Sequence, residues 1–98
     1  MFVARLERSP RKGKKWRMVF YLNGRKYGHT DFGASGYDDY TIHRDNARKQ
    51  KYLKRFGQLI AEYEDDFAAP ITLSTMILWN KPTINESLKD YKDCFKLN

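Results

Sequence analysis

Hydrophobic and polar residues alternate along the first third of the chain, which predicts short β-strands. From Phe2 to Arg8 the apolar side chains occupy every second position, and Trp16 to Leu22 gives the clearest strand pattern. Asn23-Gly24 follows directly, and both residues tolerate the positive φ angles of a type I′ turn. We therefore expect a three-stranded antiparallel meander.

The two-residue turn also predicts which residues pair in the hairpin. Leu22 would lie opposite Arg25, and the pairs then expected on the same face are Phe20 with Tyr27, Met18 with His29, and Trp16 with Asp31. This face should be the one that the helices cover. His29 is accordingly expected to be a partly buried histidine on the inner face.

The stretch from Phe32 to Asp45 is typical of a built connection between a sheet and a helix. Its glycines permit positive φ, its Asp, Thr and Ser side chains bond to nearby backbone groups, and its last residue is a plausible helix N-cap. Tyr37, Tyr40 and Ile42 are expected to anchor the loop in the core. The residues assigned a structural role in this loop are Gly33, Gly36, Tyr37, Asp39, Tyr40, His43 and Asp45.

Beyond Asp45 the apolar period changes from two residues to between three and four, which predicts amphipathic helix. The apolar stripe consists of Leu53, Phe56, Ile60, Tyr63 and Phe67. Gly57 interrupts it, so the pattern leaves open one helix with a weak point or two helices. Acidic residues crowd the end of this segment, which is the unfavourable sign for a helix C-terminus.

Two further helices are expected after Pro70. Thr72 or Ser74 would begin a short apolar helix that ends before Pro82. Thr83 and Glu86 have the spacing of a capping box and predict the start of the last helix. One face of that helix carries Ile84, Leu88, Tyr91 and Phe95.

The predicted fold class is therefore α+β, with the meander followed by a glycine-rich loop and by two or three helices packed on one face. The 98 residues form a single domain, divided into a meander (1–32), a loop (33–45) and a helical part (46–98). Trp79, Tyr91 and Phe95 are expected in the core or at an interface.

Charge is distributed unevenly over a chain of net charge +7. Residues 1–55 have a net charge of +10 and residues 56–98 a net charge of −3. A basic half points to nucleic acid or to an acidic protein surface, although cations that only maintain solubility give the same composition. The residues expected to bind such a partner are Arg11, Lys12, Lys14, Lys15, Arg17, Arg25, Lys26, Arg48, Lys51 and Arg55.

The acidic residues and histidine around the loop have the side chains of a metal or hydrolytic site, but not the spacing of one. Turns and a helix cap account for Asp38, Asp39 and Asp45, and His43 is interpreted as a hydrogen-bonding loop residue. A metal-dependent enzyme is thus the least favoured of three readings. We expect no catalytic residue, no metal ligand, no cofactor and no small-molecule substrate.

One feature of the sequence bears on the redox compartment and another on a membrane span. Cys94 is the single cysteine, which excludes an internal disulfide and suits a reducing compartment. The longest uncharged run, 67–80, has 14 residues, whereas a membrane-spanning helix needs about 20. No membrane span is expected.

Two blocks of the sequence resemble a family of small basic proteins of large nucleocytoplasmic DNA viruses, including chlorella-virus-like and giant viruses. The first block contains Phe32-Gly33-Ala34, Gly36-Tyr37, Asp39-Tyr40-Thr41, His43, Asp45, Arg48, Tyr52 and Arg55. The second contains Ile77-Leu78-Trp79-Asn80-Lys81-Pro82, Thr83, Ser87, Tyr91 and Phe95. Between them the chain departs from the family's pattern, with Phe56 and Phe67 in place of a His and a Trp.

The resemblance implies a setting rather than a reaction, because the family has no assigned activity. It implies a non-enzymatic structural protein of the virion, a minor capsid or internal shell component that bridges other virion proteins. Its location would be the virion, and the host cytoplasm or nucleus during assembly. The alternative is a nucleic-acid-binding protein of the viral core or replication apparatus that acts through the basic half.

Overall fold

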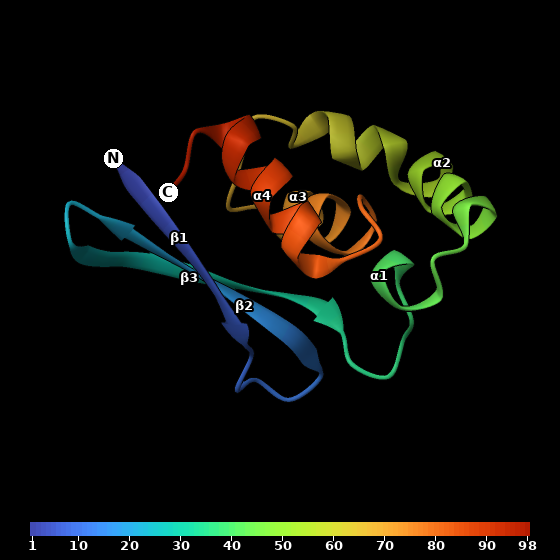
Figure 1. The fold of residues 1–98 in the computed structure, drawn as a ribbon, viewed down its shortest axis with the longest axis horizontal. Coiled ribbons are helices and arrows are strands. Elements are labelled where there is room, and N and C mark those ends of the chain that lie inside the picture. Colours follow the sequence, from blue (N-terminus) through green and yellow to red (C-terminus); the bar gives the residue numbers. More distant parts are fainter.

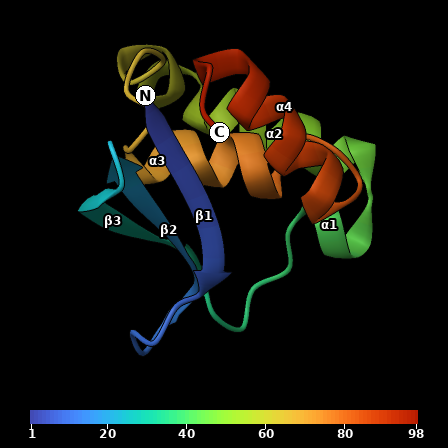
Figure 2. The ribbon, with the colours of Figure 1, turned by 60° about the vertical axis from the view of Figure 1, so that its left-hand side comes forward.

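A computed structural model describes all residues 1–98 and consists of one β-sheet with helices packed on one of its faces (Figure 1). The strands are β1 (Phe2–Arg8), β2 (Lys14–Leu22) and β3 (Arg25–Ala34), antiparallel and in the order β1-β2-β3. Figure 2 shows the helical layer lying on one side of the strands and leaving the other side of the sheet uncovered. The predicted α+β class and the three-stranded meander are confirmed.

The helical part begins with the single turn α1 (Tyr40–His43) and the long helix α2 (Asn46–Glu62). Helix α2 continues through Gly57, which settles the alternative that the sequence left open. Helix α3 (Pro70–Leu73) leads directly into a π-helical segment (Ser74–Leu78), and α4 (Ile84–Phe95) follows.

The first turns of these helices show which start signals the sequence carried. Asp45 accepts hydrogen bonds from the backbone of Ala47 and Arg48, and Thr83 accepts one from Glu86, so both predicted caps are confirmed. Helix α3 begins earlier than predicted, because Pro70 is its first residue rather than the breaker before it. A proline suits that position, where its missing N–H has no helical partner and its fixed φ is already helical.

The hairpin turn is confirmed, as is the pairing of Tyr21 with Lys26, but the pairing predicted from Phe20 onward is wrong. Asn23 and Gly24 have φ angles of 52° and 82°, and Leu22 pairs with Arg25. A β-bulge next to Tyr21 then leaves Tyr27 without a partner. The pairs that follow are Phe20 with Gly28, Met18 with Thr30, and Trp16 with Phe32.

The bulge moves the rest of β3 by one position, which exchanges the residues on its two faces. Phe32 enters the core with 1% of its surface exposed, and Thr30 donates a hydrogen bond to the carbonyl of Ala68. His29 and Asp31 lie on the uncovered face, so the inner-face position expected for His29 is wrong. The shift spares the Asp31 carboxylate from burial in the apolar layer.

The core fills the space between the sheet and the helices. Its buried side chains are Ala4, Met18, Phe20, Phe32, Leu73, Ile77, Leu78, Tyr91 and Leu97. Trp16, Trp79 and Phe95 pack against it while partly buried. The predicted inner face of α4 is therefore confirmed.

Tyr91 is the largest fully buried side chain, and its hydroxyl is satisfied. It donates a hydrogen bond of 2.6 Å to the carbonyl of Phe67, the residue that leads from α2 into α3. Burial raises the pKa of the Tyr91 hydroxyl well above its ordinary value. This bond ties α4 to the connection between α2 and α3.

The two ends of the chain meet on β1 (Figure 1). Ala4 donates a backbone hydrogen bond of 2.8 Å to Asn98, and Asn98 donates one of 3.0 Å to Phe2. Leu97 is buried in the core beside them. The last residues therefore cover part of the open edge of β1.

None of the helices is long and apolar enough to cross a membrane.

Candidate functional site

A cleft of about 640 Å³ runs along α2 and separates it from α3, the π-helical segment and the end of β3. Its walls are largely apolar, and four cations lie among them. The residues that line it are Lys15, Gly33, Ala34, Tyr37, Asp38, Asp39, Arg48, Lys51, Tyr52, Arg55, Phe56, Leu59, Pro70, Ile71, Ser74, Leu78 and Trp79. All four of these cations are among the predicted binding residues.

Two stacked aromatic rings form one wall of the cleft. Tyr52 from α2 lies parallel to Trp79, with ring centroids 4.4 Å apart and an interplanar angle of 5°. The Tyr52 hydroxyl lies 3.1 Å from the Thr75 hydroxyl, and burial raises the Tyr52 pKa. These contacts turn the ring face and the hydroxyl of Tyr52 toward the protein's own residues.

Three cations follow the cleft along successive turns of α2. Arg48, Lys51 and Arg55 are spaced three and four residues apart, all are exposed, and none forms an ion pair. The Arg55 guanidinium lies 5.2 Å from the centroid of the Phe56 ring. Three of the ten predicted binding residues thus meet at one site with their charges uncompensated.

Lys15 also lines the cleft, but its charge is balanced. Its Nζ lies 2.8 Å from Oδ2 of Asp39, which has only 3% of its surface exposed. Oδ1 of Asp39 accepts the backbone N–H of Thr41 and caps α1. The structural role predicted for Asp39 has this physical basis.

The end of β3 and the loop that follows it use glycine where the backbone requires it. Gly33 has a φ of +78°, and a Cβ built there would lie 2.8 Å from Cδ1 of Leu78 in the π-helical segment. Gly36 also has a positive φ, of +85°, but faces open space. The expected anchoring of the loop is wrong at Tyr37 and Ile42, which are 73% and 57% exposed.

His43 has the loop role that was predicted for it. Its Nδ1 accepts the backbone N–H of Asp45 at 2.9 Å, and its ring lies 5.3 Å from the ring of Trp79. Its Nε2 is buried without a hydrogen-bond partner. Tyr40 lies beside it with ring centroids 6.3 Å apart. His43 therefore helps to place Trp79 at the cleft.

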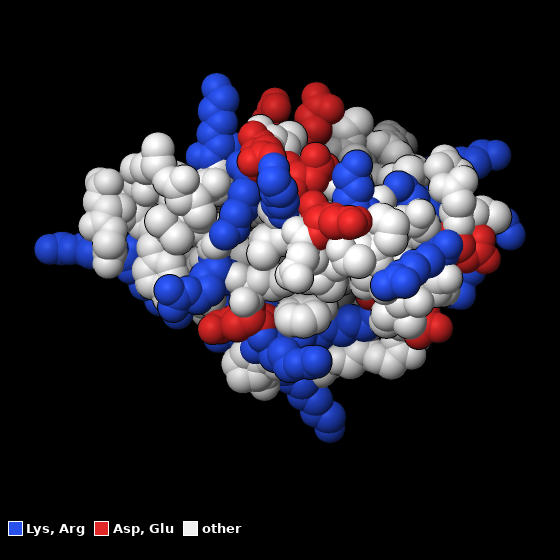
Figure 3. All heavy atoms as spheres, in the orientation of Figure 1, with Lys and Arg blue, Asp and Glu red and all other residues white.

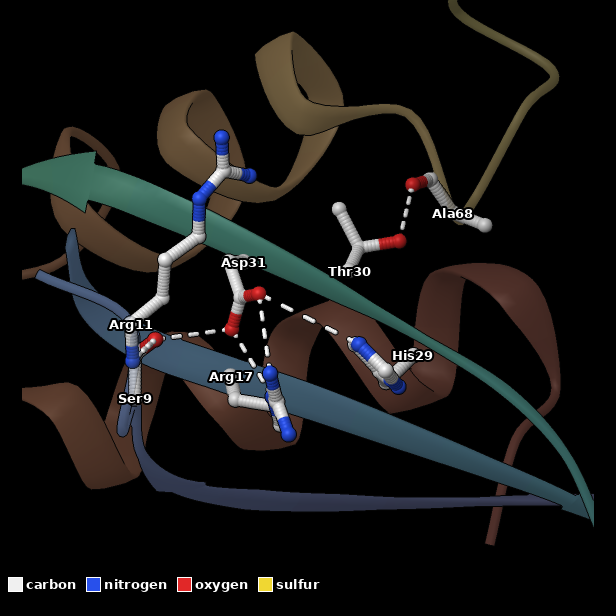
Figure 4. A network of polar contacts seen from close by, with 7 residues as sticks. All are labelled: Ser9, Arg11, Arg17, His29, Thr30, Asp31 and Ala68. Atoms are coloured by element: carbon white, nitrogen blue, oxygen red, sulfur yellow. Dashed lines mark hydrogen bonds and ion pairs between the residues drawn. The ribbon is translucent and has the colours of Figure 1, made fainter.

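The uncovered face of the sheet carries a separate polar cluster (Figure 4). The Arg17 guanidinium donates to both oxygens of Asp31, at 2.8 and 3.1 Å, and the Ser9 hydroxyl donates to Oδ1 at 2.8 Å. Nε2 of His29 lies 4.0 Å from Oδ2. The Arg17 hydrogen bonds lower the Asp31 pKa to about 2, and the same contact raises the Arg17 pKa.

The remaining predicted cations do not join the cleft. Arg11 and Lys12 lie in the β1–β2 loop and Lys14 begins β2, whereas Arg25 and Lys26 follow the turn at the other end of the hairpin. Figure 4 shows the Arg11 guanidinium directed away from Asp31. The ten predicted residues are thus divided among four locations, namely the cleft, the two ends of the hairpin and the uncovered sheet face, with Lys15 and Arg17 engaged in ion pairs.

Sequence reasoning missed most of the apolar lining of the cleft. Leu59, Pro70 and Ile71 carried no signal of a shared site, because they are brought together only by the packing of α2 against α3. Tyr52 and Trp79 were marked by the resemblance, and Trp79 was also expected in the core or at an interface.

No three side chains of His, Cys, Asp or Glu come close enough together to hold a metal ion.

A second hollow of about 440 Å³ extends the cleft toward the C-terminal end of α2. It shares Leu59, Pro70 and Ile71 with the first and adds Tyr63 and Asp66. Leu59 and Tyr63 are each 40% exposed, and α2 contains no fully buried residue. The two hollows together form a continuous surface along the helix, basic at one end and acidic at the other.

Comparison with known proteins gives one match. A family described as "Family of unknown function (DUF5754)" matches residues 4–56, which include the sheet except the first two residues of β1, together with α1 and the basic part of α2. No curated protein and no solved structure matches the chain. The matched range contains all ten cations predicted to bind a partner.

Proposed function

The chain belongs to the DUF5754 family of unknown function, and we propose that it is a non-enzymatic structural protein of a large DNA virus particle. Its role there is that of a minor capsid or internal shell component that bridges other virion proteins. It resides in the virion, and in the host cytoplasm or nucleus during assembly. The viral setting rests on the sequence resemblance described above.

The observation that carries a bridging role is the presence of separate charged surfaces on one small scaffold. Exposed cations lie at both ends of the hairpin and along α2, whereas the turn after α2 carries Glu64, Asp65 and Asp66. In Figure 3 acidic atoms gather along the upper edge, over the helical layer, with basic atoms beside them, and further basic atoms project from the lower edge and from both sides. Surfaces of opposite charge select different partners, which suits a connector between proteins.

Mass spectrometry of purified virions tests this proposal. The protein is expected in washed particles at a stoichiometry fixed relative to the main shell protein. Cross-linking in intact particles should join lysines of the chain, such as Lys12 or Lys26, to neighbouring virion proteins. Absence of the protein from washed particles would overturn the proposal.

The exposed β1–β2 loop favours one second candidate, a nucleic-acid-binding role in the viral core or replication apparatus. Arg11, Lys12 and Lys14 lie close together in sequence, and none forms an ion pair. Binding through phosphates would weaken log-linearly with salt concentration, with a slope set by the number of phosphates neutralised. A gel-shift titration of wild type and Lys12→Glu at increasing salt tests it, and no shift at low salt eliminates it.

A further inference from the structure

The long helix α2 divides its charges between its two ends. Its first ten residues, 46–55, contain five cations and no acidic residue, whereas its last seven, 56–62, contain Glu62 and no cation, and the turn that follows adds Glu64, Asp65 and Asp66. Apart from the Asp45 cap, the charges at both ends oppose the helix dipole, because the N-terminus of a helix favours anions and the C-terminus favours cations. The charged side chains within α2 therefore do not compensate the helix dipole, as they would if the acidic residues lay at its N-terminal end and the cations at its C-terminal end.

The residues that face the cleft repeat this division along one stripe. Arg48, Lys51, Arg55, Leu59 and Glu62 are separated by three or four residues, so they share one face of the helix. The first four of them line the cleft. The stripe runs from unpaired cations through an exposed leucine to an exposed carboxylate.

The apolar part of this surface is also incompletely covered. Leu59 and Tyr63 are each 40% exposed, and Pro70 and Ile71 flank them across the second hollow. A surface with an apolar centre and opposite charges at its ends is complementary to a copy of itself turned by 180°. The covering partner that fits best is a second α2 in antiparallel orientation.

We propose that the protein forms a symmetric dimer in which two α2 helices pack antiparallel over the cleft. A crossing point near Gln58 and Leu59 places Arg55 level with Glu62 of the second copy and Lys51 near the acidic turn that follows its α2. Each pair occurs twice because of the twofold symmetry. The exposed Leu59 side chains of both copies meet between the charged pairs.

The cleft suits a helix better than it suits a nucleic acid. Stacking on bases needs an open aromatic face, but Tyr52 and Trp79 stack on each other and the Tyr52 hydroxyl is bonded to Thr75. Asp38 and Asp66 on the lining would also repel phosphates. Apolar walls bordered by charge match the composition of a protein interface.

The inference deepens the proposed structural role, on which it rests only for the premise that the protein binds other proteins. The dimer and the proposed structural role can be contradicted independently of each other. A monomer in solution would overturn the dimer and leave the presence in virions unaffected, whereas absence from virions would leave a dimer standing.

Charge reversal in both directions provides the test. Arg55→Glu and Glu62→Arg should each weaken dimerisation by about tenfold or more, measured by sedimentation equilibrium at low salt, because each places two like-charged pairs across the interface. An equimolar mixture of the two variants should dimerise again, since both unlike pairs are restored in the mixed dimer. The double variant should also dimerise.

The matched controls are Lys26→Glu and Glu7→Lys, which make the same charge changes at exposed positions on the sheet. Both should retain the wild-type dissociation constant, and circular dichroism should show every variant folded. A wild type that stays monomeric at about 1 mM, where even a millimolar dissociation constant gives substantial dimer, would overturn the proposal. So would a mixture of the reversed variants that remains monomeric, or a monomer that binds RNA through Lys51.

Discussion

The Arg17 guanidinium holds the Asp31 carboxylate through two hydrogen bonds, of 2.8 and 3.1 Å, on the sheet face that no helix covers. The bulge at Tyr27 brings Asp31 of β3 to this face, on which Arg17 of β2 already lies. Ser9 adds a third hydrogen bond from the end of β1, so the cluster connects all three strands.

This cluster predicts a loss of stability in acid. The Asp31 pKa is about 2 in the folded protein and 3.8 ordinarily, so the carboxylate stabilises the fold above about pH 4. That contribution should disappear as the pH falls from about 4 to about 2. Thermal unfolding of wild type and Asp31→Asn across this range measures it.

The variant should melt about 5 °C below wild type at neutral pH, as expected for a loss of roughly 1 kcal/mol in a domain of this size. The difference should narrow toward pH 2, since the wild type loses the same charge. Asp65→Asn, at an exposed position outside the cluster, is the control. Equal curves for wild type and Asp31→Asn at every pH would contradict the assigned contacts.

Gly33→Ala should destabilise the protein more than Gly36→Ala. Both glycines have positive φ, which costs a residue with a Cβ about 1 kcal/mol or more. Only at position 33 would the new methyl group also lie 2.8 Å from Leu78. Urea denaturation should show a difference of about 1–3 kcal/mol between the two variants. Equal losses would show that Leu78 can move away freely.

Tyr91→Phe should remove stability without changing the shape of the core. The hydroxyl donates to the Phe67 carbonyl, which would lose that partner beside a buried ring. The expected cost is about 1–3 kcal/mol in the free energy of unfolding, measured by urea denaturation. Tyr52→Phe removes a hydroxyl bonded to Thr75 on the half-buried cleft wall and should cost less. The reverse order would contradict the role given to Tyr91.

Asp39→Ala should loosen the loop that borders the cleft. It removes the cap of α1 and leaves the Lys15 ammonium without its partner. A loss of about 1–3 kcal/mol in urea denaturation is expected. Asp38→Ala, at the exposed neighbouring position, is the matched control and should be within about 0.5 kcal/mol of wild type.

The sequence predicted the elements whose signals are local. The Asn23-Gly24 turn, the caps at Asp45 and Thr83, and the apolar face of α4 depend on neighbouring residues, and each was found as predicted. The bulge was not predicted, because alternation alone does not mark a strand that contains an unpaired residue. Its cause is tertiary: the shift buries Phe32 and leaves Asp31 in contact with Arg17.

The candidate site was predicted in its charges but not in its shape. Arg48, Lys51 and Arg55 were identified from composition, yet the cleft between α2 and α3 depends on how far those helices lie apart. The ion pairs of Lys15 and Arg17 join residues 24 and 14 positions apart in sequence, and nothing local indicates such partners. The sequence therefore overestimated the number of free cations.

The backbone bonds that join Asn98 to Phe2 and Ala4 also have a mechanical consequence. A force that pulls the two ends of the chain apart acts first on this short ladder and on Leu97 beside it. The force reaches the helices and the cleft only after these backbone hydrogen bonds break. A chain held in an assembly by its two ends would yield at the edge of β1 while its α2 surface kept its shape.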